Sequence, residues 1–407
     1  MKRWITIWLF YAVIPLAIQA SDKTASFDFY GDTMSFKYDE SQVVHFAEKG
    51  FTDSSIQNFY TTLSKADLTD ILSTLDSYQQ KYNPDDWLYY QLVRKTVEQI
   101  SPKVANYLQY TLYKWFFMIK AGYGTMLSYN NGRILFYIQC DENIYNIPYR
   151  MKDGKQYVCL NYHDYGGHID FDREQFIPVN IALPAFAKTF SYKIKKLPRF
   201  NETDYVDKKL YFTYNSNEYN FKIKINPQIS SLFNNYPVVD YKDYINIPLS
   251  DDTYQSLISL LKKQVKGLSP KNGVDYLMHF TRYAFAFDND TEVFGSEKRL
   301  SPEQTLLSPY SDCEDRVGLF FFLVKEIYNL PMIVLAYPKH VTIAVKFNKP
   351  VGKAIQYNGE KYSVCEPTPQ SADLRVGEMI PALQKERYEV AYAYYPSIKA
   401  VDDGQNK

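Results

Sequence analysis

Hydrophobic residues in the first third of the chain recur at intervals of three and four positions, which is the period of an amphipathic helix. Leu88 and Leu92 show this spacing within one such stretch. The stretches lie at residues 53–64, 65–81, 85–100 and 104–121. Pro84 and Pro102 interrupt the pattern, because proline disrupts a helix interior. We therefore predict four helices in this part of the chain.

From residue 125 onward the period changes to two, which is typical of strands with one buried face. The alternating segments lie at residues 125–163 and 181–225. Gly132 and Gly154 stand in short polar turns that predict hairpins. The helical period returns at residues 254–265 and 274–285. Runs of helices and runs of strands thus follow one another, which favours the α+β class.

Two distant segments of the sequence are similar. Residues 115–140 and 320–347 each read as an aromatic helix followed by two strands, and each precedes a glycine hairpin into a tyrosine-containing strand. Either the segment is duplicated, or two helix–hairpin units rich in Phe and Tyr align by chance. In this alignment Leu108 falls near the position of Cys313, Leu135 near that of His340, and Asn161 near that of Glu366, as the printed sequence shows.

The composition indicates an ordinary globular protein of two or three domains. The chain has 407 residues, of which 46% are hydrophobic and 23% charged. Its formal net charge of +0 gives no electrostatic reason to expect nucleic acid as a partner. The 39 tyrosines could bind peptide or sugar at the surface, or they could lie half-buried in sheets.

The first twenty residues resemble a secretory signal peptide. Lys2 and Arg3 precede an apolar run, and Ala20 is a small residue at the expected cleavage point. An uncleaved anchor is the alternative, but the run is short for a membrane span and Pro15 interrupts it. No cysteine follows directly, which argues against a lipoprotein. We expect a secreted or periplasmic protein with no stable membrane span after cleavage.

Cys313 is the candidate nucleophile. It stands where an apolar helix begins, so the positive end of the helix dipole and free N–H groups would face its sulfur. These groups favour the thiolate and could stabilise an oxyanion. Asp312 is the expected N-cap, but it and its acidic neighbours raise a thiol pKa. A cationic partner is therefore required.

His340 and Glu366 are the candidate partners of the thiol. His340 opens an alternating strand, and Glu366 stands at the end of the next strand. His340 would act as the base, and Glu366 would hold the imidazole in one tautomer. The other histidines, none of which follows the cysteine helix on a strand, are His45, His163, His168 and His279.

The remaining cysteines and histidines do not predict a metal site or a cofactor. No pair or cluster has metal-ligand spacing, so we expect neither. Cys140 and Cys159 flank a hairpin-like stretch and could form a disulfide bond, whereas Cys365 lies in a segment typical of a buried strand.

The segment around Cys313 resembles the transglutaminase-like superfamily of papain-like cysteine enzymes, and within it the bacterial transglutaminase-like cysteine proteinase type. The resemblance covers residues 251–396, roughly a third of the chain. The matching positions are Ser301-Pro302-Glu303, Thr305-Leu306, Asp312-Cys313-Glu314-Asp315, His340 and Glu366-Pro367-Thr368. It implies a core in which the cysteine helix packs on an antiparallel sheet, with Cys313 as nucleophile and His340 as base.

The sequence departs from the family pattern at two positions. Ser311 stands where the family usually has glycine, and Glu366 stands where it usually has aspartate. A glutamate is one methylene longer and can still reach the histidine. The helper residue that the family places at the oxyanion is not evident, and Tyr310 is our candidate, with Asp312 in a supporting role.

These patterns predict an exported α+β protein with a papain-like core at its C-terminal end. The expected parts are a signal peptide at 1–20, helices plus hairpins at 21–180, a β-rich connector at 181–250, a catalytic domain at 251–398 and a polar tail at 399–407. We expect a thiol enzyme acting on amide bonds of protein or peptide, with hydrolysis favoured over transamidation. The alternative is a non-catalytic envelope protein that binds peptide or glycan. The sequence does not indicate an oligomeric state.

Overall fold

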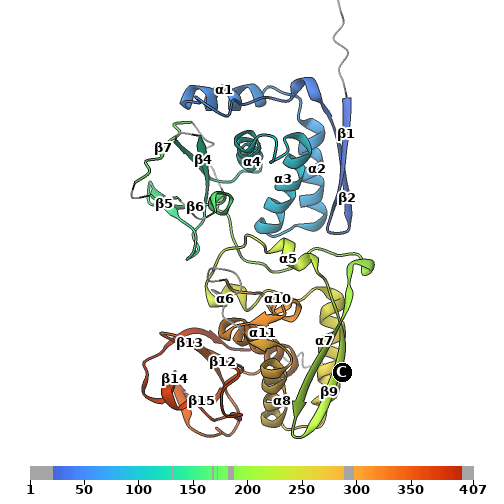
Figure 1. The fold of residues 1–407 in the computed structure, drawn as a ribbon, viewed down its shortest axis with the longest axis vertical. Helices are drawn as coiled ribbons and strands as arrows, with labels where there is room; N and C mark the ends of the chain where they lie inside the picture. The colour runs from blue at the N-terminus through green and yellow to red at the C-terminus, as the bar shows by residue number, and fades with distance from the viewer. Residues whose placement is uncertain are drawn as a thin grey trace, which may run out of the picture.

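The computed structural model describes residues 22–130, 132–166, 169–171, 173–181, 188–287 and 298–396. The predicted signal peptide, the predicted polar tail and His168 lie outside these residues. The chain forms two lobes stacked along the long axis of the molecule (Figure 1). We name the part of residues 22–200 that is described the N-lobe, and the part of residues 206–396 that is described the C-lobe.

The N-lobe begins with a hairpin and four helices. Their bounds are β1 (Asp22–Phe29), β2 (Asp32–Asp39), η1 (Glu40–Gln42), α1 (Asp53–Leu63), α2 (Thr69–Tyr82), α3 (Asp86–Ile100) and α4 (Tyr107–Lys120). The four helices predicted from the apolar period are confirmed. Helix α2 ends at Asn83, which adopts a left-handed conformation (φ 43°) just before Pro84. Helix α4 is buried on nearly every side, because it lies between α3 and the sheet.

The N-lobe sheet is antiparallel and five-stranded. Its elements are β3 (Thr125–Asn130), β4 (Arg133–Gln139), β5 (Tyr149–Lys152), β6 (Lys155–Cys159) and β7 (Ile177–Pro178), with η2 (Tyr162–Tyr165) after β6. The strand order is β5-β6-β4-β3-β7. One face, with Ile134 and Phe136, joins the core that contains α4, whereas Leu135 and Tyr137 on the other face belong to a separate small cluster.

The C-lobe starts with a second hairpin and its helices. After η3 (Glu202–Asp204), which joins the lobes, these are β8 (Val206–Tyr214), β9 (Asn217–Ile225), α5 (Gln228–Leu232), α6 (Tyr241–Tyr244), α7 (Asp251–Gln264), α8 (Pro270–Tyr283), β10 (Ala286–Phe287), α10 (Pro302–Leu307), β11 (Tyr310–Ser311) and α11 (Cys313–Tyr328). Helix α11 carries an almost continuous apolar run and is buried all round from Asp315 to Val324. It packs on α8 and on the sheet that follows.

The C-lobe sheet is also antiparallel and five-stranded. Its elements are β12 (Met332–Tyr337), β13 (His340–Val345), β14 (Ala354–Tyr357), β15 (Glu360–Cys365) and β16 (Glu389–Tyr394), with η4 (Pro381–Lys385) before β16. The strand order is β14-β15-β13-β12-β16. Alternation along β13 sends Val341, Ile343 and Val345 into the core shared with α11.

The two lobes follow the same chain path. Each sheet is preceded by a buried helix, and the strand order of the second repeats that of the first, with β14, β15, β13, β12 and β16 in place of β5, β6, β4, β3 and β7. In each central hairpin a two-residue turn connects the strands. The last paired residues before these turns are Asn130–Arg133 and Tyr337–His340. The opening hairpins also pack alike, β1-β2 against α2 and α3, and β8-β9 against α7 and α8.

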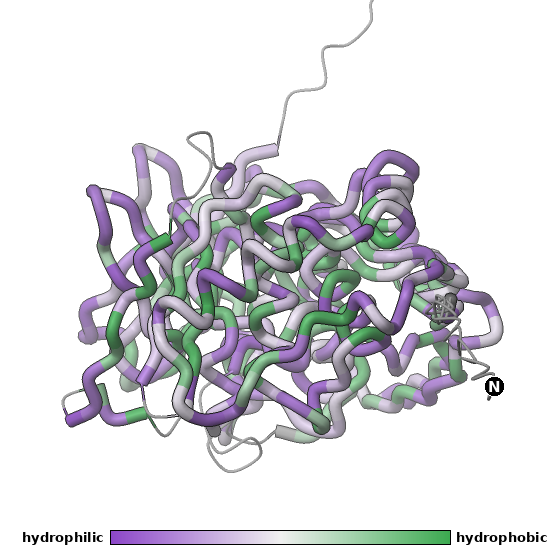
Figure 2. The backbone as a smooth tube through the Cα atoms, turned by 90° about the horizontal axis from the view of Figure 1, so that it is seen from above, coloured by the Kyte–Doolittle hydropathy of each residue, from purple (hydrophilic) through white to green (hydrophobic). Residues whose placement is uncertain are grey.

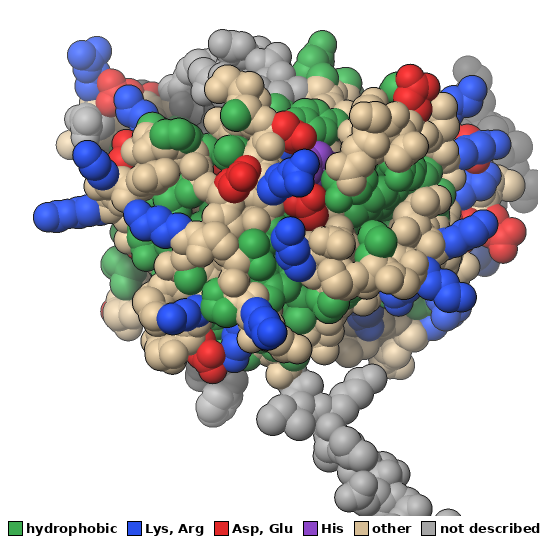
Figure 3. Space-filling model, turned by 90° about the horizontal axis from the view of Figure 1, so that it is seen from below, with side chains coloured by type: hydrophobic (Ala, Val, Ile, Leu, Met, Phe, Trp, Pro, Cys, Tyr) green, Lys and Arg blue, Asp and Glu red, His purple; other side chains and the backbone are tan. Residues whose placement is uncertain are grey.

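The predicted α+β class is confirmed by this arrangement of helices and antiparallel sheets. Hydrophobic stretches run through the middle of the molecule and hydrophilic stretches mark much of its outline (Figure 2). Acidic and basic side chains are interspersed on the end face of the C-lobe (Figure 3). None of the helices in the described part of the chain combines the length and apolar composition that a membrane crossing requires.

The suggested disulfide bond between Cys140 and Cys159 is absent. All four cysteines lie among the described residues and are free thiols. Cys140 continues the inner face of β4 and joins the main core, whereas Cys159 pairs with Tyr137 and joins the cluster on the outer face. The two sulfurs therefore lie on opposite faces of one sheet.

Candidate functional site around Cys313

Cys313 is the first residue of α11, and the acids beside it fix where this helix begins. Asp312 is the N-cap, and its Oδ1 accepts a hydrogen bond from the Asp315 N–H at 3.1 Å. In return, Asp315 Oδ2 accepts from the Asp312 N–H at 3.4 Å. This reciprocal capping box holds the thiol in the first turn of the helix, where backbone N–H groups lack helical partners. Cys313 is partly buried.

His340 and Glu366 are paired. His340 opens β13, and Glu366 follows the last residue of β15, the neighbouring strand. The Nε2 atom of His340 lies 2.9 Å from Oε2 of Glu366. The other carboxylate oxygen, Oε1, accepts from the Thr368 N–H at 2.9 Å, and Glu366 is only 1% exposed. An Nε2–H that donates to this carboxylate leaves Nδ1 as the basic nitrogen of the ring.

A second buried network holds Glu366 from behind. The Arg282 guanidinium donates to the Glu366 carbonyl through Nη2 and through Nε, the latter at 3.1 Å. Arg282 also pairs with Asp373 at 2.6 Å. His279 belongs to the same network, since its two ring nitrogens face the Asp275 carbonyl at 2.8 Å and Asp373 at 3.2 Å. His279, a rival base in the sequence, is thus engaged elsewhere.

The structure brings the three predicted residues to one place. The N–H of Val341, the residue after His340, acts on the Cys313 sulfur and lowers its pKa. Burial, together with the charges of Asp312, Glu314 and Glu366, has the larger effect and raises the pKa of Cys313 to about 12. Burial and these charges therefore favour the thiol over the thiolate, and the sulfur needs a base to become a nucleophile.

Glu314, the residue after Cys313, binds two side chains that the sequence did not identify. Its Oε2 accepts from Arg299 Nε at 2.7 Å, and its Oε1 accepts from the Tyr241 hydroxyl at 2.6 Å. Arg299 stacks on the Tyr241 ring, with its Cζ 4.2 Å from the ring centroid. Burial raises the pKa of Tyr241, and the Cys313 thiolate would raise it further. Tyr241 is therefore held by Glu314, the residue after Cys313.

Tyr310, our sequence candidate for the oxyanion, has a different environment. It lies in the two-residue strand β11, is 43% exposed, and its N–H donates to Ser308 Oγ at 3.3 Å. None of its described contacts reaches Cys313. Tyr241 comes from α6, far back in the sequence, so no local motif could have identified it.

Arg316 is a second residue that the sequence did not single out. It lies one turn beyond Cys313, is fully buried, and donates to the carbonyls of Arg282, Ala286 and Ser311 at 2.7, 2.8 and 3.4 Å. It also donates to Thr281 and Phe285. Burial lowers the pKa of Arg316 to about 10. This side chain ties the end of α8 to the loop that delivers the thiol.

The corresponding place in the N-lobe lacks this chemistry. The shared chain path puts Tyr107 at the start of α4, Arg133 at the start of β4 and Asn161 after β6. Tyr107 and Arg133 therefore replace Leu108 and Leu135 of the sequence alignment. Asn161 Nδ2 donates to the Tyr107 hydroxyl at 2.9 Å, and Arg133 pairs with Glu174. These three positions provide neither a thiol nor an imidazole.

No family model, curated protein or solved structure matches this chain. Among the residues that the structure describes, no group of three or more His, Cys, Asp or Glu side chains has an arrangement that could hold a metal ion. The assignment of a function therefore depends on the local geometry around Cys313.

Proposed function

We propose that the chain is an exported thiol enzyme that cleaves amide bonds with Cys313, His340 and Glu366, on a transglutaminase-like, papain-like core in the C-lobe. The observation that carries the proposal is the 2.9 Å pair between His340 and Glu366 beside a helix that begins with a cysteine. A thiol, a base and an acid that orients the base are the components of this chemistry. The signal-like first twenty residues support export.

In the proposed mechanism, His340 Nδ1 takes the proton from Cys313 as the sulfur attacks the substrate carbonyl carbon. The imidazolium that forms is stabilised by Glu366, and the oxyanion faces the N–H groups of the first turn of α11. Collapse breaks the C–N bond, and His340 gives its proton to the departing amine. A thioester on Cys313 remains, and water activated by His340 hydrolyses it to the free acid and thiol.

The raised pKa of Cys313 makes the base essential to this mechanism. A thiol whose pKa is about 12 yields little thiolate alone at neutral pH. Proton transfer to His340 creates opposite charges side by side, and each stabilises the other. Removal of the imidazole should therefore abolish activity rather than merely slow it. Hydrolysis is favoured over transamidation because water is always present and no described feature marks a site for an amine acceptor.

Labelling of the thiol as a function of pH tests this proposal. Iodoacetamide should label Cys313 at neutral pH in the wild type, because His340 takes the proton of the thiol. In His340→Ala the labelling should need alkaline pH. Cys313→Ala identifies the signal of this cysteine against the three buried ones, and it should have no activity on a panel of amide substrates. Retained activity in Cys313→Ala would reject the proposal.

A second candidate function follows from the same pKa. If Cys313 stays protonated in every state, the lobe is a non-catalytic module that binds peptide or glycan. Labelling would then rise only above about pH 9, equally in the wild type and in His340→Ala. The pH profile of the two proteins therefore separates an enzyme from a binding module.

A further inference from the structure

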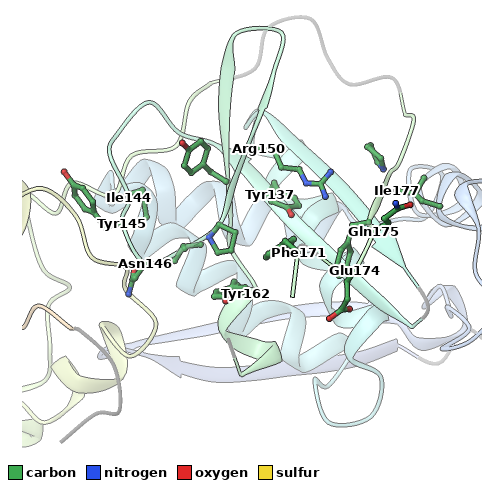
Figure 4. A pocket seen from close by; sticks show the side chains of 15 residues that line it. Tyr137, Ile144, Tyr145, Asn146, Arg150, Tyr162, Phe171, Glu174, Gln175 and Ile177 are labelled. Atoms are coloured by element: carbon green, nitrogen blue, oxygen red, sulfur yellow. The ribbon is translucent and has the colours of Figure 1, made fainter. Parts of the chain in front are cut away.

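The N-lobe has a large open hollow on the face of its sheet that lies away from α4. Its volume is about 1000 Å³, at the upper end of the ~300–1,000 Å³ range of ligand pockets. It extends from the edge strand β5 to the edge strand β7, across Tyr137 of the central strand β4 (Figure 4). Aromatic rings of Tyr149, Tyr162, Phe171 and Phe176 line it. The hollow thus offers an apolar, ring-rich wall to a ligand.

The floor of the hollow carries a buried hydroxyl beside Arg150. Tyr137 is 0% exposed, and its hydroxyl lies near the side chains of Arg150 and Ser128 without a hydrogen bond of good geometry to either. Burial raises the pKa of Tyr137 to about 12, while the nearby Arg150 opposes this shift. Ala344 occupies the corresponding register position in the C-lobe, since Tyr137 pairs with Cys159 and Ala344 with Val364. The ring and its hydroxyl are thus particular to the N-lobe.

Arg150 supplies a positive charge at the same point. It reaches from β5 toward the middle of the hollow, and its Cζ lies 5.7 Å from the Tyr137 ring centroid (Figure 4). No acidic side chain among the described residues forms an ion pair with it, whereas Arg133 at the rim is paired with Glu174. A guanidinium only donates, so an anionic acceptor with two oxygens is its best complement. The hollow therefore selects a carboxylate attached to an apolar group.

One rim of the hollow lies near a residue that contacts the neighbour of the thiol. Tyr145 lines it, and the Tyr145 ring centroid lies 5.9 Å from Cζ of Arg299, the residue that holds Glu314 beside Cys313. The Tyr145 hydroxyl also donates to Asp240 at 2.6 Å, which joins this wall to the C-lobe. A ligand in the hollow would thus lie on the N-lobe side of the junction that leads to Cys313.

We propose that this hollow binds a peptide carboxylate, with Arg150 and the Tyr137 hydroxyl on the carboxylate and the aromatic rings around an adjacent apolar side chain. The inference rests on the proposed function, in that this peptide is the substrate whose amide bond Cys313 cleaves. A neutral glycan could stack on the rings but would leave the Arg150 charge without a partner. A peptide satisfies both features of the hollow.

Binding to the full-length Cys313→Ala protein tests the proposal without turnover. The probe is an acetylated Gly-Ala-Phe peptide with a free C-terminal carboxylate, measured by calorimetry. Its C-terminal amide should bind at least ~10-fold more weakly, because it loses a charge-assisted pair. An acetylated Gly-Asp-Phe amide, whose only carboxylate is on a side chain, shows whether Arg150 accepts an internal acidic residue or only a chain terminus.

Three variants, each made in the Cys313→Ala background, make the test specific. Arg150→Met should weaken binding of the carboxylate peptide at least ~10-fold and remove the preference over the amide. Tyr137→Phe keeps the ring, and should weaken binding by a smaller factor. Arg173→Met is the matched control, because the Arg173 side chain is 87% exposed and lies outside the hollow. Melting temperatures near that of the parent protein establish that the variants are folded.

The outcomes distinguish this inference from the proposed function. Equal binding of acid and amide, unchanged binding in Arg150→Met, or binding only of a neutral oligosaccharide would overturn the carboxylate site. Specific binding of the carboxylate peptide by a protein that shows no thiol-dependent activity would support the site and reject the enzyme. Activity on small amides without any binding in the hollow would support the enzyme and reject the carboxylate site.

Discussion

The His340 imidazole and the Glu366 carboxylate, 2.9 Å apart, are each fixed by the ends of neighbouring strands in one sheet. His340 ends the two-residue hairpin that begins at Tyr337, and Glu366 has one oxygen on the Thr368 N–H and its carbonyl on Arg282. The orientation of the ring is therefore set where β13 begins and β15 ends. The proposed chemistry at Cys313 would depend on this orientation.

Replacement of Glu366 tests the orienting role. Glu366→Gln keeps the volume but removes the charge that stabilises the imidazolium, so kcat/KM should fall by ~10²–10⁴. Glu366→Asp keeps the charge but is shorter, and should lose less. The measurement is kcat/KM across pH on whichever amide substrate the panel identifies, with thermal melting as a check of folding. Wild-type kcat/KM in Glu366→Gln would exclude this role.

Arg316 should be essential to stability. Arg316→Met leaves the carbonyls of Thr281, Arg282 and Ala286 buried without their donor. Since an unsatisfied buried polar group costs ~1–3 kcal/mol, we expect the free energy of unfolding to fall by at least ~3 kcal/mol. Urea denaturation measures this change. Arg173→Met, on an exposed side chain, is the control and should change it by less than ~0.5 kcal/mol.

Lys114 should destabilise the protein most at low pH. It is 1% exposed, and burial, with Arg94 adding repulsion, lowers its pKa to about 7. The unfolded chain binds this proton up to about pH 10.4, so Lys114 opposes folding fully below pH 7, and this opposition fades as the pH rises toward 10. Lys114→Met should therefore stabilise the protein by ~1–4 kcal/mol at pH 6 and by less at pH 9.

Chemical denaturation of the wild type and Lys114→Met at the two pH values gives this difference. Lys95→Met is the control, because the Lys95 side chain is exposed on α3. An equal gain at pH 6 and pH 9 would mean that packing, not charge, explains the stabilisation.

Cys159 should make the protein less stable at alkaline pH. Burial raises its pKa to about 12, whereas a thiol in an unfolded chain titrates near pH 8.5. Above about pH 8.5 the unfolded state releases a proton that the folded state keeps, so stability falls by up to ~1.4 kcal/mol per pH unit for this group. Cys159→Ala should show a shallower decline from pH 8.5 to 10.5 than the wild type, in melts with a reductant present. Parallel declines would contradict the assignment.

Local patterns in the sequence predicted the parts of the fold that depend on local rules. The apolar period located α1 to α4, and Asp312 was the expected N-cap of α11. The segments that are similar in sequence belong to lobes with the same strand order. The pairing of His340 with Glu366 was also expected, because both residues stood at strand ends.

The parts that failed or were missed depend on packing between distant segments. Tyr241, which pairs with Glu314, was missed because it comes from α6, far back in the sequence. Face alternation separates Cys140 from Cys159, although the hairpin brings their strands together. The five carbonyls around Arg316 come from the end of α8, the bend after it and two short strands, and no spacing along the chain predicts such a cluster.

The unpaired state of all four cysteines has a practical consequence for how this protein reaches its final form. None of the four forms a disulfide bond with another, so we expect the chain to fold under reducing conditions. Refolding from denaturant should give the same yield in glutathione buffers of any ratio, and a reducing host cytosol should suffice for recombinant production.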